Sequence, residues 1–188
     1  MSLLEALVAR RAYYLLSALV LVADQLAKVF AHALLRPHGA VEVIPDLFNL
    51  SYSRNAGGLF GYFSGWPDPW RTLLLTILPL GAIALIAVFI ARGDAADRRS
   101  LVGLALILGG AAGNLIDRIA RGEVVDFLDV YASSPRLSGW LLERFGTAHW
   151  PTFNLADSAI VCGAGLLLLS LLRPVASSSE AAQAEEPR

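Results

Sequence analysis

The sequence predicts an all-α polytopic membrane protein with four transmembrane helices, a small extracytoplasmic β-sheet and a short interfacial helix. Of its 188 residues, 56% are hydrophobic and only 16% are charged, which is too apolar for the wetted surface of a soluble domain. The mean hydropathy of +0.58 agrees with this. The third observation is that the apolar residues gather in separate runs, each long enough to cross a hydrocarbon core of roughly 30 Å as a helix.

These apolar runs are the four predicted spans, at about residues 12–35, 70–91, 100–119 and 154–173. We therefore expect a single four-helix membrane domain over residues 1–174. The first run is similar to a secretory signal peptide, but the polar stretch DQLAK interrupts it where such a signal stays apolar. We interpret this run as a retained membrane helix.

The arginines indicate that both termini are cytoplasmic. The short link RGDAADRR between the second and third spans carries three arginines, and Arg10, Arg11 and Arg173 flank the first and last spans. Dense positive charge in short flanks marks the cytoplasmic side of a membrane protein. The tail at residues 175–188 is small, polar and acidic, so we expect a disordered cytoplasmic segment.

Two outer loops carry further predicted structure. Residues 40–63 mix β-branched and aromatic residues with turn signals at Pro45-Asp46 and at residues 55–58, which predicts short strands joined by a tight glycine turn. Residues 130–150 contain LSGWLLERF, a pattern typical of a short amphipathic helix that lies on a membrane surface.

Composition and motif spacing exclude several function classes. A net charge of −1 gives no basic footprint for nucleic acid. The single cysteine excludes an intrachain disulfide and a cysteine metal cluster. The three histidines lack the helical spacing of a metal site such as H-E-x-x-H. We expect no metal and no cofactor, and because nothing in the sequence requires a second chain, we expect a monomer.

Polar residues at three span ends are predicted to meet at the outer membrane face, because four spans with both termini inside place these ends together. They are Asp24, Lys28, Asn114, Asp117, Arg118, Asn154 and Asp157. Asp24 and Lys28, four residues apart on one helix face, predict a structural ion pair. Gly113 and Gly109 give the third span a Gly-x-x-x-Gly face for close helix packing.

Asp126 and Asp157 are the candidate catalytic residues. Asp126 lies in GEVVDFLDV, among apolar neighbours that follow the third span. Either aspartate alone fits a helix cap or a turn, but two carboxyl groups held together at a low-dielectric face share one proton. An aspartic peptidase uses this arrangement, since one carboxylate activates a water while the other, protonated, polarises the scissile carbonyl. The pair predicts metal-free peptide hydrolysis.

Four sequence blocks resemble the lipoprotein signal peptidase family, also called signal peptidase II. They are DQLAK at 24–28, SRNAGGLFG at 53–61, GNLIDRIARGEVVDF at 113–127 and FNLADSAI at 153–160. The blocks follow the family's order over nearly the whole membrane region. Two features depart from the family's pattern: an extra glycine at residues 55–59, and a longer segment at residues 130–150 between the two aspartates.

The resemblance implies a membrane-embedded aspartyl endopeptidase of the bacterial cytoplasmic membrane, with its active site at the outer face. Its substrates would be diacylglyceryl-modified prolipoproteins, cut just before the lipidated lipobox cysteine, and membrane lipids would be further partners. Arg118 or Arg121 is a candidate to hold a lipid phosphate. The family's catalytic positions fall on Asp126 and Asp157. The resemblance further implies that Asp24 and Lys28 support the fold and that the site is shaped by Asn55, Asn114, Asp117, Arg118 and Asn154.

Two other functions fit the same residues. A membrane transporter or proton relay also uses intramembrane carboxylates, although here they gather at one face and the chain shows no internal repeat. A non-catalytic anchoring subunit would use the polar cluster only to pack its helices. Its function would survive Asp126→Asn and Asp157→Asn.

Overall fold

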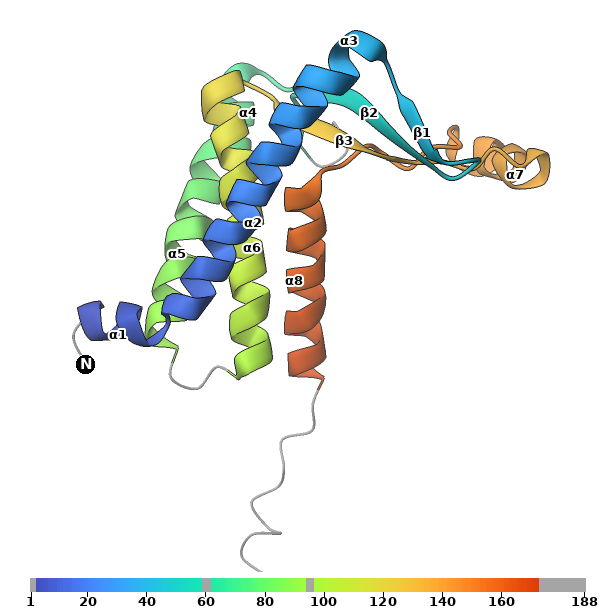
Figure 1. The fold of residues 1–188 in the computed structure, drawn as a ribbon. Coiled ribbons are helices and arrows are strands. Elements are labelled where there is room, and N and C mark those ends of the chain that lie inside the picture. Colours follow the sequence, from blue (N-terminus) through green and yellow to red (C-terminus); the bar gives the residue numbers. More distant parts are fainter. Residues whose placement is uncertain (1–2, 59–61, 94–96, 173–188) are drawn as a thin grey trace, which may run out of the picture.

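The computed structural model describes residues 3–58, 62–93 and 97–172. Figure 1 shows long helices side by side, with an arm of three strands and one helix that projects sideways from one end of this bundle. The short helix α1 lies at the opposite end, which is also where α8 ends. The tail predicted at residues 175–188 lies outside the described residues.

The helices follow one another along the chain, and several join without a loop. They are α1 (Leu3–Ala9), α2 (Arg11–Phe30), η1 (Ala31–Leu35), α3 (Arg36–His38), α4 (Asp68–Thr72), η3 (Leu73–Ile77), α5 (Leu78–Arg92), α6 (Arg98–Arg121), α7 (Pro135–Phe145) and α8 (Leu155–Leu171). The elements η1 and η3 are π-helical turns inside longer helices. The second of them lies just before Pro79, because a proline ring conflicts with the carbonyl four residues earlier and a π turn relieves that conflict.

Among the described residues, three helices are long and apolar enough to cross a membrane. They cover Arg11–His38, Asp68–Arg92 and Arg98–Arg121, with 28, 25 and 24 residues. Helix α8 is apolar but has 17 residues, fewer than the roughly 20 that a perpendicular span needs. The structure confirms a mostly helical protein with helices long and apolar enough to span a membrane and with a small sheet, and the fourth span stays a prediction.

Helix α6 is the centre of the bundle and contacts α2, α5 and α8. Its glycines permit close approach, since a Cβ atom at Gly109 would meet the backbone of α2 and one at Gly110 would clash with the Ala156 carbonyl of α8. At Gly113 the space is taken by Asp24, whose Oδ2 lies 2.5 Å from the Cβ position. Small residues at such contacts stabilise helix pairs in lipid by tight packing.

The sheet of the arm consists of three antiparallel strands in the order β1-β2-β3. β1 covers Val41–Ile44, β2 covers Phe48–Asn55, and β3 covers Val124–Val130. β3 follows α6 and pairs with β2 in a register that places Ser53 opposite Asp126. The pattern at residues 40–63 did not predict this third strand, because its sequence lies far along the chain.

Of the two predicted turn signals, the one at Pro45-Asp46 is confirmed, whereas the glycine turn at residues 55–58 follows β2 and joins it to no further strand among the described residues. β1 and β2 are joined at residues 45–47, where Asp46 adopts a φ of 67°. Aspartate tolerates this left-handed conformation better than most residues, because its short side chain can hydrogen-bond to nearby backbone. The glycines follow the end of β2 at Asn55, and Gly58 has a φ of 58°.

Side-chain alternation along β3 separates a structural face from a polar one. Val125 and Phe127 are buried, and Phe127 packs against Ala31 and Leu35 at the end of the first long helix. Successive strand residues point to opposite faces, so Asp126 points away from this apolar cluster. The packing of Phe127 therefore fixes the direction in which Asp126 points.

Candidate active site

Asn154 is the N-cap of α8 and the centre of the candidate site. Its side-chain oxygen accepts a hydrogen bond from Asp157 N at 3.0 Å, and Asp157 Oδ2 accepts one from Asn154 N at 3.2 Å. This reciprocal capping box satisfies two donors that have no partner within the helix. Because Asn154 is fully buried, the box holds Asp157 in one place at the start of α8.

Asp126 is joined to Asn154 by a direct hydrogen bond. Asn154 Nδ2 donates to Asp126 Oδ1 at 2.7 Å, and Asn55 Nδ2 at the end of β2 donates to Asp126 Oδ2 at 3.0 Å. Asp126 is 1% exposed. Amide donors from two different elements thus hold both oxygens of this carboxyl group.

Asn114 of α6 completes the link between the two aspartates. Its Nδ2 donates to Asp157 Oδ1 at 2.7 Å, and its Oδ1 accepts from Asn154 Nδ2 at 3.2 Å. Lys28 Nζ donates to the same Asn114 oxygen at 3.0 Å. Two asparagine side chains therefore connect Asp126 and Asp157 in one hydrogen-bonded unit.

A buried ion cluster of Asp24, Lys28 and Asp117 lies next to this unit. Lys28 Nζ is 2.8 Å from Asp24 Oδ2 and 2.9 Å from Asp117 Oδ2, and all three side chains are fully buried. Asp24 Oδ1 also accepts from Ala156 N at 3.0 Å, and Asp117 pairs with Arg121. Charge-assisted hydrogen bonds of this kind hold the first and third long helices to the start of α8.

Burial raises the pKa of Asp126 to about 6, and the nearby Asp157 carboxylate acts in the same direction. The hydrogen bonds from Asn55 and Asn154 favour the charged form and oppose this rise. Two carboxyl groups at a low-dielectric site cannot both ionise freely. Asp126 is therefore a group that takes up a proton close to neutral pH.

Arg118 extends from α6 toward the aspartates. Its charge interacts with those of Asp157, Asp126 and Asp117, and its Nη2 lies 3.4 Å from the Cβ position of Gly58. Its Nε is buried and has no hydrogen-bond partner among the described residues. Arg118 thus brings a positive charge and a spare donor to the carboxyl pair.

A cavity of about 420 Å³ opens beside Asp126. It is lined by the end of β2 and by the loops that follow β2 and precede α8. The lining residues are Ser53, Arg54, Asn55, Ala56, Gly57, Ser64, Asp126, Pro151 and Thr152. Its volume lies within the range of about 300–1,000 Å³ that is usual for ligand sites, so a substrate segment has room to reach Asp126 from the arm.

Five polar residues at or beside the site were not predicted: Gln25, Ser53, Arg54, Ser64 and Thr152. Gln25 Nε2 donates to Asp117 Oδ1 at 3.2 Å and to the Gly113 carbonyl at 3.1 Å. The signal for Gln25 was present, because an amide inside an apolar span requires a partner. The two serines, the threonine and Arg54 gave no signal, since such residues are ordinary in strands and surface loops.

The donor set of the site consists of carboxyl groups, amides and one arginine. Within residues 3–58, 62–93 and 97–172, no group of three or more His, Cys, Asp or Glu residues is placed to hold a metal ion. A protonated and an ionised carboxyl group can together deliver and accept protons at one bond. Fold and site thus define the class: a helical membrane protein with a carboxyl pair suited to hydrolysis.

Known sequences place the chain within that class. The family described as Signal peptidase (SPase) II matches residues 16–173. The lipoprotein signal peptidase of Solibacter usitatus is 40% identical over 86% of this chain and 90% of its own length. That of Geobacter metallireducens is 38% identical over 87% of this chain and 91% of its own length.

Two solved structures, both described as bacterial membrane enzymes, share the fold. One aligns with a TM-score of 0.69 at 26% identity and covers 94% of this chain and 93% of its own. The other aligns with a TM-score of 0.68 at 28% identity and covers 87% of this chain and 94% of its own. The chain belongs to the signal peptidase II family and is a membrane-embedded protease.

Proposed function

We propose that this protein removes the signal peptide of diacylglyceryl-modified prolipoproteins by cutting before the lipidated cysteine, with Asp126 and Asp157 as its catalytic residues. The relatives named lipoprotein signal peptidase support the substrate class. The observation that supports the catalytic pair is the unit in which Asn114 and Asn154 connect the two carboxyl groups.

In this mechanism Asp126 is the acid and Asp157 is the base. Asp126 holds a proton readily, because burial raises its pKa to about 6. Asp157 accepts hydrogen bonds from Asn114 Nδ2 and Asn154 N, and the N-terminal end of a helix favours negative charge. Both features support an ionised Asp157 that can take a proton from water.

The proton transfers balance over one turnover. Asp157 removes a proton from a water whose oxygen attacks the scissile carbonyl carbon, and Asp126 gives its proton to the carbonyl oxygen, which yields a neutral gem-diol. The C–N bond then breaks as Asp157 returns its proton to the leaving nitrogen and Asp126 recovers one from a gem-diol hydroxyl. The pair ends in its starting state.

We further propose that α8 is a fourth span, that both termini are cytoplasmic and that the site lies at the outer face. The position of α1 and the end of α8, both opposite the arm, supports this topology. The arginine-rich flanks support the orientation. The lipid of the substrate would then anchor the peptide at the membrane surface, where positioning lowers the barrier to attack. Because one chain supplies every residue of the carboxyl unit, we propose a monomer.

Cleavage of a diacylglyceryl-modified prolipoprotein by purified protein in detergent tests the proposal. Wild type should process the substrate equally with and without a chelator. Asp126→Asn and Asp157→Asn should each lower the rate by roughly 10²- to 10⁴-fold, because each removes a proton donor or acceptor. Asp129→Asn is the matched control, since Asp129 lies on the same strand and pairs with His149 instead.

Equal rates in the two aspartate variants and wild type would overturn the assignment of the catalytic pair. Cleavage that requires the unmodified precursor would overturn the substrate class. A folded wild-type protein that cuts neither form would favour transport or anchoring.

A further inference from the structure

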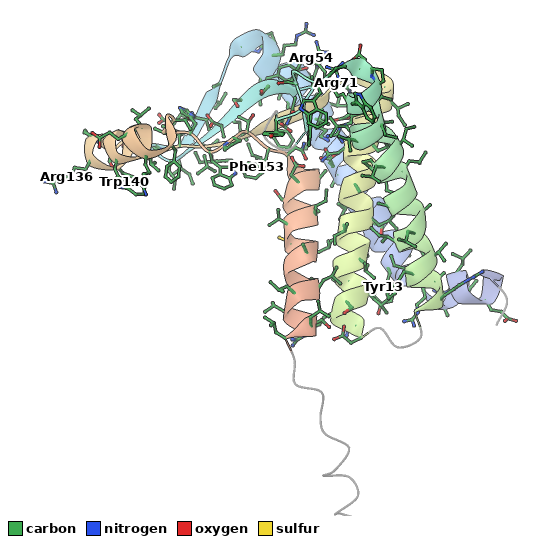
Figure 2. All side chains as sticks on the ribbon, turned by 180° about the vertical axis from the view of Figure 1, so that it is seen from behind. Tyr13, Arg54, Arg71, Arg136, Trp140 and Phe153 are labelled. Atoms are coloured by element: carbon green, nitrogen blue, oxygen red, sulfur yellow. The ribbon has the colours of Figure 1, made fainter. Side chains whose placement is uncertain are left out.

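A second cavity of about 420 Å³ lies by β2 and the outer end of the first long helix. Its lining includes Val125, which points to the opposite face of β3 from Asp126. The polar groups around it are His32, Arg36, Tyr52, Arg54, Arg121 and Glu123. Arg54 also borders the cavity beside Asp126, and Figure 2 places it at the end of the bundle that carries the arm.

His32 and Tyr52 present a free hydroxyl donor to this cavity. Arg36 Nη1 lies 3.4 Å from His32 Nε2, and His32 Nδ1 lies 3.0 Å from the Tyr52 hydroxyl. Arginine can only donate, so Nε2 is the acceptor and Nδ1–H donates to the tyrosine oxygen. The hydroxyl hydrogen of Tyr52 then remains for a ligand.

The arginines make the cavity positively charged. Arg54 uses Nε to pair with Glu123 at 2.7 Å, which leaves its terminal amino groups for another acceptor. Arg121 contacts Asp117 and, through Nη1, Gln25 Oε1 at 3.1 Å. Three guanidinium groups and one carboxylate line the space, and arginine groups of this kind favour phosphate.

The apolar part of the lining indicates where the anion comes from. Val29 and Ala33 border the cavity, and the neighbouring side chains Leu26, Phe30 and Leu34 are 54%, 62% and 58% exposed. These residues belong to a helix that is long and apolar enough to span a membrane, so their exposed side chains face lipid. Basic groups above lipid-facing apolar groups match a phospholipid, whose phosphate sits directly above its acyl chains.

We propose that this cavity binds the phosphate headgroup of an anionic membrane phospholipid, with Arg36, Arg54 and the Tyr52 hydroxyl as its donors. The site is separate from the carboxyl pair. The sequence-based hypothesis offered Arg118 or Arg121 for a lipid phosphate: the charge of Arg118 interacts with the aspartates, whereas Arg121 lines this cavity but pairs with Asp117.

Native mass spectrometry of the full-length protein, released from detergent micelles that contain equal phosphatidylglycerol and phosphatidylcholine, tests the site. Wild type should retain phosphatidylglycerol preferentially. Arg36→Gln combined with Arg54→Gln should weaken that retention roughly tenfold or more, because it removes two charge-assisted contacts to the phosphate. The control is Arg136→Gln combined with Arg144→Gln on α7, which removes the same charge elsewhere.

Several results would overturn the site. Equal retention of both lipids by wild type would overturn it. An equal loss of phosphatidylglycerol retention in the α7 control would also overturn it. Displacement of the lipid by an equal concentration of soluble glycerol phosphate would show a site for a free anion instead. Asp126→Asn should keep the lipid preference even though it abolishes cleavage, so this inference and the proposed peptidase activity can fail separately.

Discussion

Lys28 Nζ donates to the side-chain oxygen of Asn114 at 3.0 Å, and this contact determines which end of the Asn114 amide faces Asp157. An ammonium group can only donate, so the oxygen of Asn114 must face Lys28 and its Nδ2 must face the carboxylate. The buried ion cluster therefore orients the site in addition to holding the helices together.

Lys28→Met should destabilise the protein by about 3–5 kcal/mol, because it leaves Asp24 buried without its cation. Thermal unfolding in detergent measures this loss. The control Arg71→Met removes the partner of Asp68, whose side chain is 80% exposed, and such a surface pair contributes at most about 1 kcal/mol. Equal losses in the two variants would contradict a structural role for the buried cluster.

Asn55→Ala should move the alkaline limb of the rate profile to higher pH. The hydrogen bond from Asn55 stabilises the ionised form of Asp126, so its removal raises the pKa of Asp126 further above its present value of about 6. An acid that must be protonated then keeps its proton to a higher pH. The pH dependence of kcat/KM measures the shift.

Asn49→Ala is the control for that profile, because Asn49 also lies on β2 but contacts Asp129 at 3.4 Å. The alkaline limb of the Asn49→Ala rate profile should stay at the wild-type pH. A limb that moves to lower pH in Asn55→Ala would show that Asp126 does not act as the acid.

Stability should fall as pH rises through the titration range of Asp126. Burial raises its pKa from the ordinary value of 3.8 to about 6, so the folded state binds this proton more tightly than the unfolded state. Between these two values the folded state holds more protons, and each pH unit removes up to about 1.4 kcal/mol. The loss is complete above about pH 6.

Unfolding midpoints of wild type and Asp126→Asn between pH 4 and pH 7 test this linkage. As pH rises, the unfolding midpoint of wild type should fall relative to that of the variant, since asparagine does not titrate. Parallel curves would show that Asp126 ionises as easily in the folded state as in the unfolded state.

The polar residues of the site were predictable because each one stands out against an apolar segment. Asn114 and Asp157 lie in apolar helices, where an amide or carboxylate requires a partner. Helix topology then brings the ends of these segments together. The capping box at Asn154 was not predicted, because a helix cap was considered only for the aspartates.

The pairing of β2 with β3 was not predictable in the same way. Its register places Ser53 opposite Asp126, and that depends on how Phe127 packs under η1, which is a tertiary contact. The local turn signal at Pro45-Asp46 marked the hairpin correctly, whereas the glycines after Asn55 follow β2 and join it to no further strand among the described residues. Contacts between distant segments decide such positions.

Gly163→Leu should disrupt the packing of α6 against α8. A Cβ atom at Gly163 would lie 2.5 Å from the Gly103 carbonyl and 2.8 Å from an Ile107 side-chain carbon, and backbone cannot move aside cheaply. We expect destabilisation of several kcal/mol, in the range of other core overpacking. Thermal unfolding measures it.

Gly165→Leu is the matched control two residues along the same helix, because no atom of the residues that the structure describes lies within 4 Å of its Cβ position. It should be neutral or stabilising by up to about 1 kcal/mol, since leucine favours helix more than glycine. Equal destabilisation by both variants would show that the loss does not depend on the α6–α8 contact.

The apolar face of α7 should lie in the membrane interface. Trp140 and Phe145 are 56% and 64% exposed and pack edge to face at 5.8 Å. Figure 2 shows Trp140 below α7, on the side toward which the long helices extend. An exposed tryptophan beside Arg136 and Arg144 is typical of an interfacial anchor.

Fluorescence of a variant that keeps Trp140 as its only tryptophan tests this position in nanodiscs. Lipids brominated near the headgroup should quench it more than lipids brominated at the chain ends, and aqueous iodide should quench it weakly. The control keeps Trp66 in place of Trp140, since Trp66 precedes α4 and lies outside the arm. Strong iodide quenching of Trp140 with no effect of bromolipid would place α7 in water. Such a result would remove lipid contact as the reason for its amphipathic sequence.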